Sequence, residues 1–175
     1  TNLARPYSVP SAVHAKPDRT TGSFSTVPYA DGMALEDYYV ELFDAASNTI
    51  EIVNPYLNPT PAIAAAIDRA LDRGVKITIV GRIDLKGDLG GKILTELNEL
   101  FVEKYADRIE IHEFKAPGVV LHPKVLMIDG RLLTFSSVNL NHRSFLHDSE
   151  NGVTVLDPAF YRTMKAIFES YIDRS

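Results

Sequence analysis

The 175-residue sequence contains no cysteine, which excludes disulfides, thiolate metal sites and a cysteine nucleophile. No apolar run approaches the roughly 18 residues that a membrane-spanning helix requires. The first residues lack the charged and then apolar pattern of a signal peptide, and no methionine stands at position 1. We therefore expect a processed protein or a piece of a longer one.

The sequence also lacks an excess of positive charge. It has 18 Lys and Arg residues against 23 Asp and Glu residues, a net charge of −5. This net negative charge does not favour tight, non-specific binding of nucleic acid, although a local basic patch remains compatible with it. Hydrophobic residues make up 45% and charged residues 23%, as is ordinary for a soluble globular protein. The length suits one compact domain.

Residues 1–30 show no hydrophobic periodicity and contain four prolines among Ser, Thr and Gly. This composition predicts an irregular N-terminal arm or linker. A regular pattern starts at about residue 31, so we expect a single domain over 31–175. Within it, segments of helical and strand periodicity alternate. The sequence therefore predicts an α/β fold with a mixed, largely buried sheet flanked by helices.

The expected helices share apolar residues at helical spacing, and the expected strands are short apolar or β-branched runs. The expected helices cover residues 35–46, 61–73, 93–101 and 158–171, with Thr60 as an N-cap, Pro61 as the first helical residue and Gly74 as a stop. The expected strands cover 49–53, 75–80, 108–111, 124–128, 131–135 and 153–156. The last helix is expected to turn Phe160, Met164, Ile167, Phe168 and Tyr171 inward.

The segment with the strongest chemical pattern is VVLHPKVLMIDGRLLTFSSVNLNHRS, which begins at Val119. His122 and Lys124 are two residues apart, so in an extended chain both point to one face. An ammonium there can neutralise a phosphate oxygen, and an imidazole can attack phosphorus or shuttle a proton near neutral pH. Asn139 and Ser137 add donors for the equatorial oxygens of a phosphoryl transition state.

An isolated His-x-Lys pair is usually a surface histidine and a strand-end charge. The whole string favours a functional site over that interpretation, because it fixes five polar residues at defined offsets. It resembles the hallmark of the phospholipase D superfamily, H-x-K-x4-D-x6-G-S-x-N. The matching residues are His122, Lys124, Asp129, Ser137 and Asn139.

The resemblance extends beyond the hallmark, to about residues 33–172. Asn139, Arg143-Ser144 and Glu150 are similar to the tail of cardiolipin synthase-like members, and residues 52–57 and 73–75 resemble that group's strand-flanking segments. Three positions depart from the usual pattern. Ser136 replaces Gly, Asn141 replaces Asp, and Asp148 stands where many members have Asn.

The resemblance implies a role for each matched residue. His122 would be the nucleophile or the acid–base residue, and Lys124 and Asn139 would bind the phosphate. Glu150 would accept a hydrogen bond from His122 and so fix its tautomer, with an exposed carboxylate as the alternative. Ser137 would be a supporting donor. Asp129, which precedes Gly130 in a turn-like pair, would be structural.

The hallmark occurs once, whereas family members join two copies so that two histidines face one phosphate. Another His-x-Lys, His14-Ala15-Lys16, lacks the following Asp and Asn, and we interpret it as a coincidence. The partner motif would therefore come from a second chain or from a missing N-terminal half. In that second case His122 would be the acid–base partner.

Two further residues are candidates with simpler alternatives. Tyr56 follows a strand and is a candidate pocket residue that binds substrate, although a packing role is equally consistent. Arg82 could touch a phosphate, but a solvated loop charge is the better interpretation. His112, His142 and His147 have no metal-ligand spacing.

Three functions follow from these expectations. The first is a phosphodiesterase or transphosphatidylase that acts on phospholipids through a phosphohistidine, with no metal or cofactor. It implies a phospholipid or other phosphodiester substrate and permits peripheral membrane contact. The second is a homodimeric endonuclease of the same superfamily, against which the acidic charge balance counts. The third is a non-catalytic half-domain that pairs with another domain.

Overall fold

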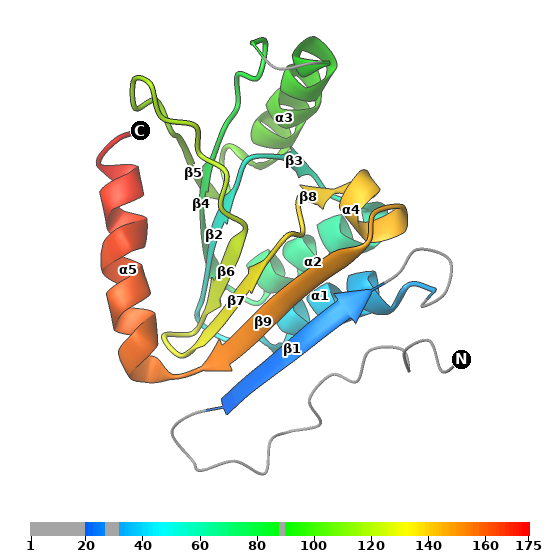
Figure 1. The fold of residues 1–175 in the computed structure, drawn as a ribbon, viewed down its shortest axis with the longest axis vertical. Coiled ribbons are helices and arrows are strands. Elements are labelled where there is room, and N and C mark those ends of the chain that lie inside the picture. The colour runs from blue at the N-terminus through cyan, green and yellow to red at the C-terminus, as the bar shows by residue number, and fades with distance from the viewer. Residues whose placement is uncertain (1–19, 27–31, 88–89) are drawn as a thin grey trace.

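A computed structural model of the protein describes residues 20–26, 32–87 and 90–175. Within these residues, seven strands form one mixed sheet in the order β1-β9-β7-β6-β2-β4-β5 (Figure 1). Strands β2, β4 and β5 are parallel, and the remaining neighbours are antiparallel. The predicted α/β fold with a mixed sheet flanked by helices is confirmed.

The elements have the following bounds. The strands of the large sheet are β1 (Thr20–Thr26), β2 (Thr49–Asn54), β4 (Lys76–Gly81), β5 (Glu110–Glu113), β6 (Val125–Ile128), β7 (Leu132–Ser136) and β9 (Glu150–Leu156). A small sheet pairs β3 (Leu57–Asn58) with β8 (Leu140–Asn141). The helices are α1 (Ala34–Ala45), α2 (Pro61–Asp72), α3 (Gly91–Tyr105), α4 (His142–Leu146) and α5 (Pro158–Ile172).

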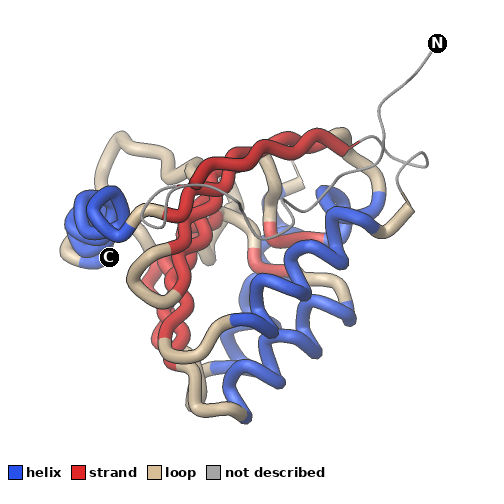
Figure 2. The backbone as a smooth tube through the Cα atoms, turned by 90° about the horizontal axis from the view of Figure 1, so that it is seen from below, coloured by secondary structure: helices blue, strands red, loops and turns tan. Residues whose placement is uncertain are grey.

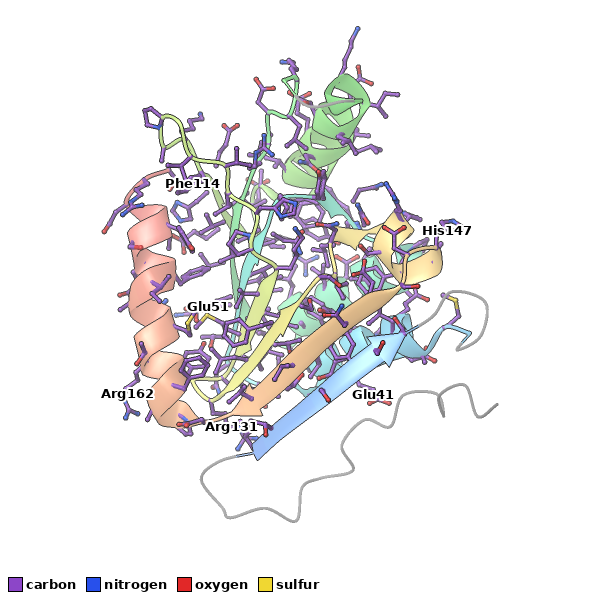
Figure 3. All side chains as sticks on the ribbon, viewed as in Figure 1. Glu41, Glu51, Phe114, Arg131, His147 and Arg162 are labelled. Atoms are coloured by element: carbon purple, nitrogen blue, oxygen red, sulfur yellow. The ribbon has the colours of Figure 1, made fainter. Side chains whose placement is uncertain are left out.

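Both faces of the sheet are covered, as Figure 2 shows. Alternate residues of β2 point to opposite faces. Ile50 and Ile52 belong to the core cluster that includes α1 and α2, whereas Val53 belongs to the cluster under α5. Glu51 also points toward α5 (Figure 3), where its buried carboxylate accepts a hydrogen bond from Tyr161 Oη at 2.6 Å.

The start and end of α2 follow the predicted signals. Thr60 is the N-cap and its Oγ1 accepts a hydrogen bond from Ile63 N at 3.4 Å, while Pro61 is the first helical residue. Gly74 follows the helix with a φ of +84°, a conformation that glycine adopts without strain.

Two sequence-based expectations were wrong. The expected irregular arm includes β1, whose seven residues pair antiparallel with β9 from Thr20↔Leu156 to Thr26↔Glu150. Its sequence, TTGSFST, gave no hydrophobic periodicity, because Phe24 is its one apolar residue and the other buried position, Thr26, is polar. The rest of the arm, with His14 and Lys16, lies outside the described residues. On α5, Phe160 and Ile167 are 39% and 40% exposed rather than inward.

The end of the sheet where β2 stops is held by two buried asparagines. Asn54 Oδ1 accepts hydrogen bonds from Tyr56 N at 3.2 Å and Leu140 N at 3.1 Å, and its Nδ2 donates to Val138 O at 3.2 Å. Asn98 on α3 accepts from Leu57 N at 2.8 Å and donates to Arg82 O at 2.6 Å and Pro55 O at 3.4 Å. These amides replace the backbone partners that the irregular segments lack.

Asp129 lies at the opposite end of β6, in the turn to β7, with a φ of +52°. Its carboxylate accepts hydrogen bonds from Ser47 N at 2.8 Å, Asn48 N at 2.7 Å and Thr49 N at 2.9 Å. Partial burial alone would raise the pKa of this carboxyl. The three N–H donors outweigh it and hold the pKa of Asp129 below its ordinary value.

Asn98→Ala should lower the free energy of unfolding by about 2–4 kcal/mol, because it leaves two buried backbone groups and one half-buried group without this partner. Glu99→Ala, at the exposed next position of the same helix, is the matched control and should stay within about 0.5 kcal/mol of the wild type. Urea denaturation measures both. Equal stability of the two variants would contradict the anchoring role of Asn98.

Asp129→Asn should make the free energy of unfolding depend less on pH in the acid range. Folding favours ionised Asp129, so its contribution is present above the unfolded-chain pKa and is lost as the pH falls through the lower folded-state pKa. Asparagine tolerates the positive φ but carries no charge. Urea denaturation at about pH 6 and about pH 3 should show a larger loss for the wild type than for Asp129→Asn. Asp107→Asn, at an exposed position, should behave as the wild type does. If Asp129→Asn lost as much stability between these two pH values as the wild type, this role of Asp129 would be contradicted.

Candidate active site

The matched residues other than Asp129 meet at one end of the sheet, where four strands begin or end. Because β2 and β6 are antiparallel and Val53 faces Val125, Asn54 at the end of β2 adjoins Lys124 at the start of β6. Strand β7 ends at Ser136, opposite Gly152 of β9, and β9 begins at Glu150. Residues far apart in the sequence thus surround one place, at the carboxyl end of the parallel strands.

His122 and Lys124 are in direct contact. Lys124 Nζ lies 3.0 Å from each ring nitrogen of His122 and donates a hydrogen bond to the His122 carbonyl oxygen at 2.8 Å. The His122 side chain is exposed, whereas Lys124 is only 7% exposed. An accessible imidazole beside a fixed ammonium is the arrangement that the spacing predicted.

The charge of Lys124 is set by its surroundings. Burial lowers the pKa of the Lys124 ammonium, and the negative charge of nearby Glu150 partly opposes this shift. Glu150 itself is 4% exposed. A buried cation and a buried carboxylate therefore lie near each other at this end of the sheet, where a charge interacts more strongly with an anion than it would in water.

Ser137, which follows β7, is bonded to Glu150 and Asn151 at the start of β9. Its hydroxyl donates to Glu150 Oε2 and accepts a hydrogen bond from Asn151 N at 3.0 Å. The Ser137 backbone N donates to Asn151 O at 2.9 Å. Ser137 thus fixes one carboxylate oxygen of Glu150, and the expected hydrogen bond between Glu150 and His122 stays a prediction.

Ser136, the departure from the usual glycine, is accommodated by its neighbours. Its hydroxyl lies 3.0 Å from Tyr39 Oη and accepts from Val138 N at 3.2 Å. Burial raises the pKa of the Tyr39 phenol, so the phenol stays protonated. Across the ladder, a Cβ on Gly152 would lie 2.8 Å from Ser136 Cβ and 2.4 Å from Phe24 Cζ. Gly152 on the facing strand thus leaves room for Ser136 and Phe24, and Ser136 braces the loop that follows it.

Asn139 sits in the loop between β7 and β8. Its backbone N donates to Ser144 Oγ at 3.0 Å. Among the described residues, Asn139 Oδ1 is a buried atom with no hydrogen-bond partner. Such atoms are rare in folded proteins and call for an explanation, of which a ligand-binding role is one.

A cavity of about 360 Å³ opens beside Asn139, between α3, the small β3–β8 sheet and α4. Tyr56 is among the residues that line it, and its role in binding substrate stays a prediction. The remaining lining residues are Asn58, Leu94, Leu97, Asn98, Asn139, Asn141, His142, Arg143 and Asp148.

The structure thus brings together His122, Lys124, Ser137 and Glu150, with Asn139 in the adjoining loop and Tyr56 on the cavity. Asp129 lies apart from them. Asn54 and Tyr39, which position the site from β2 and α1, were not predicted as site residues from the sequence. Asn54 carried a signal, since it stands at the end of an apolar run and directly before Pro55. Tyr39 carried none beyond its place in an apolar helical stripe.

The described parts of the chain hold no group of three or more His, Asp or Glu side chains that could bind a metal ion. No helix in the same ranges is long and apolar enough to cross a bilayer.

Curated relatives point to one family. The chain is 28% identical over 150 residues to probable cardiolipin synthase YwiE of Bacillus subtilis (strain 168), which covers 81% of this chain and 27% of the relative. It is 33% identical over 133 residues to cardiolipin synthase A of Buchnera aphidicola subsp. Schizaphis graminum (strain Sg), which covers 75% of this chain and 26% of the relative. The chain spans about a quarter of the length of these relatives.

Solved structures share the fold. Nuc, a phospholipase D family member from Salmonella typhimurium, matches with a TM-score of 0.71 at 17% identity, over 90% of this chain and 96% of that one. The phosphatidylserine synthase of Haemophilus influenzae Rd KW20 matches with a TM-score of 0.73 at 21% identity, over 97% of this chain and 42% of that one. A family model described as "Cardiolipin synthase, PLD-like domain" matches residues 39–172. The chain therefore belongs to the phospholipase D-like family of cardiolipin synthase domains.

Proposed function

We propose that the chain supplies one half of a phosphodiester-processing active site that acts on phospholipids by hydrolysis or transfer. The observation that carries this proposal is the contact of exposed His122 with buried Lys124. A nucleophile or proton donor and a cation are thereby presented to the same phosphate. The names of the curated relatives favour a phospholipid substrate over a nucleic acid.

Each residue has a distinct task in this proposal. Lys124 neutralises a non-bridging oxygen and Asn139 donates its amide to another. His122 either attacks phosphorus, while the phosphorus–oxygen bond to the leaving alcohol breaks, or protonates that leaving oxygen. In the first case water or an acceptor alcohol then attacks the phosphohistidine. No step needs a metal ion or another cofactor.

The acidic residues act indirectly. Glu150 balances the charge of Lys124. It also accepts a hydrogen bond from Ser137 and so holds the β7–β8 loop, which carries Asn139, against β9. Its second task, orienting the His122 ring, would fix the tautomer that reacts. Asp129 is structural, since its three bonds hold the turn that precedes β2.

A second histidine is required on the opposite side of the phosphate. In-line displacement places the attacking and the leaving oxygen or nitrogen on opposite faces of phosphorus, so His122 cannot serve both. We infer that the second histidine belongs to another copy of this chain or to a further domain of a longer protein. The relatives named above are about four times as long as the matched segment, which leaves room for such a domain.

His122→Asn should lower the rate of hydrolysis of a soluble phosphodiester by at least about two orders of magnitude, as expected for a lost nucleophile or general acid. His112→Asn, on the edge strand β5, is the control and should retain the wild-type rate. Activity should survive EDTA. Complete inhibition by EDTA, reversed by a divalent ion, would contradict the proposed chemistry.

Activity of the isolated 175-residue chain should depend on association. If two copies share the site, specific activity should fall on dilution, in step with the dimer fraction measured by sedimentation, because a two-fold axis must bring two copies of His122 together. If a further domain supplies the partner, the chain should be monomeric and nearly inactive. A monomeric preparation with robust turnover, proportional to enzyme concentration at high dilution, would contradict the half-site.

A further inference from the structure

The loop between β5 and β6, residues 114–124, has an apolar tip. Its ends are anchored, since Phe114 and Leu121 are buried members of the core cluster under α5. Between them, Val119 and Val120 are 55% and 66% exposed. Single exposed apolar residues are ordinary on a protein surface, whereas contiguous ones mark a surface that binds a partner. This tip is therefore a candidate interaction site.

The backbone of the loop holds the two valines outward. Val119 N donates to Ala116 O at 3.2 Å, which closes a four-residue turn, and Gly118 within that turn has a φ of +71°. Pro117 followed by a glycine with positive φ is typical of a type II turn. Phe114 N donates to Gly81 O at 2.9 Å, so the loop starts in fixed register with β4. An ordered turn that already presents its apolar residues loses little conformational entropy on binding.

The same end of the molecule has a small excess of positive charge. Residues 113–124 include two basic residues and one acidic residue, Glu113, which pairs with Lys115 at 2.8 Å. Residues 82–92, which follow β4, include three basic and two acidic residues. Because β4 and β5 are parallel neighbours, both loops extend beyond the same sheet end, at the top of the view in Figure 1. This local excess contrasts with the net charge of −5 of the whole chain.

The tip lies close to the proposed phosphate site. Val120 precedes His122 by two residues, which even an extended chain spans in roughly 7 Å. Interfacial helices bury their apolar face roughly 5–10 Å deep, at the boundary between lipid headgroups and acyl chains. At that depth, the valines would place the exposed His122 at the level of the lipid phosphates.

We propose that this sheet end docks on a lipid bilayer, with Val119 and Val120 among the upper acyl-chain carbons and the basic residues of the two loops against anionic headgroups. The inference rests on the proposed function, since it explains how His122 reaches a phosphate that stays in a bilayer. A second copy of this chain fits the tip less well. A two-fold contact through it would bring the positively charged loops of both copies together.

The absence of tryptophan from the chain provides a direct test. Val120→Trp introduces a single fluorescent reporter at the tip, and Val153→Trp, which replaces a 44% exposed valine of β9, is the matched control. With vesicles of phosphatidylcholine and phosphatidylserine, the emission of Val120→Trp should shift to shorter wavelength. It should also be quenched by lipids that are brominated in their acyl chains. The emission of Val153→Trp should show neither change.

Vesicle sedimentation of the full chain measures the apolar and the charged contributions separately. The double variant Val119→Ser, Val120→Ser should bind at least about tenfold more weakly, because less apolar area enters the bilayer. Val153→Ser should bind as the wild type does. Lys115→Gln should weaken binding about three- to fivefold, only on vesicles that contain phosphatidylserine. Its control is Lys76→Gln, at the exposed start of β4, which should bind as the wild type does.

The outcomes separate this inference from the proposed function. Val120→Trp emission that does not respond to vesicles, or equal binding by the wild type and the double serine variant, would overturn the docking surface. Hydrolysis of a soluble phosphodiester that depends on His122 would still support the phosphate site in that case. A shift of the Val120→Trp emission at higher protein concentration without lipid would overturn the inference in favour of a second copy. His122→Asn should bind vesicles as the wild type does, and loss of this binding would overturn the inference, because the phosphate site rather than the tip would then hold the lipid.

Discussion

The side chain of Asn54 is the constraint on which the site depends. It ends β2, lies buried, and binds backbone groups on both sides of the sheet end. Through Val138 and Leu140 it fixes the loop that carries Asn139, and through Tyr56 it fixes the turn into β3. A single amide thus ties the β7–β8 loop and the turn into β3 to the end of β2, which pairs with β6 beside Lys124. No apolar side chain could do this, because each contact is a directional hydrogen bond.

Ser136 shows how a departure from a family pattern is absorbed. The hallmark glycine leaves space, and here a hydroxyl occupies that space and gains contacts with Tyr39 and Val138. The space is instead left at Gly152 on the facing strand, where a Cβ would collide with Phe24. The close packing of β7 against β9 at this point therefore depends on a serine on one strand and a glycine on the other.

Much of the fold followed from the sequence, because apolar periodicity marks elements that bury a face. The boundaries of α2 followed from Thr60, Pro61 and Gly74, and the pairing of His122 with Lys124 followed from the period of an extended chain. The rest could not be predicted in this way. Strand β1 has one apolar residue, Phe24, so it leaves no apolar periodicity in the sequence although Phe24 is buried, and β3 and β8 are two residues each. The exposed positions of Phe160 and Ile167 and the cavity beside Asn139 depend on tertiary placement, which periodicity does not contain.

The order of the strands has a kinetic consequence. Contacts at the site join residues separated by about eighty positions, as in the hydrogen bonds of Asn54 with Val138 and Leu140, and β1 pairs with β9 across more than a hundred. Such distant closures are costly in chain entropy until most of the sheet exists. The β7–β8 loop, which carries Asn139, should consequently be among the last parts to form during folding. Local unfolding of β9 would also disperse the site while α1, α2 and β2 stay intact.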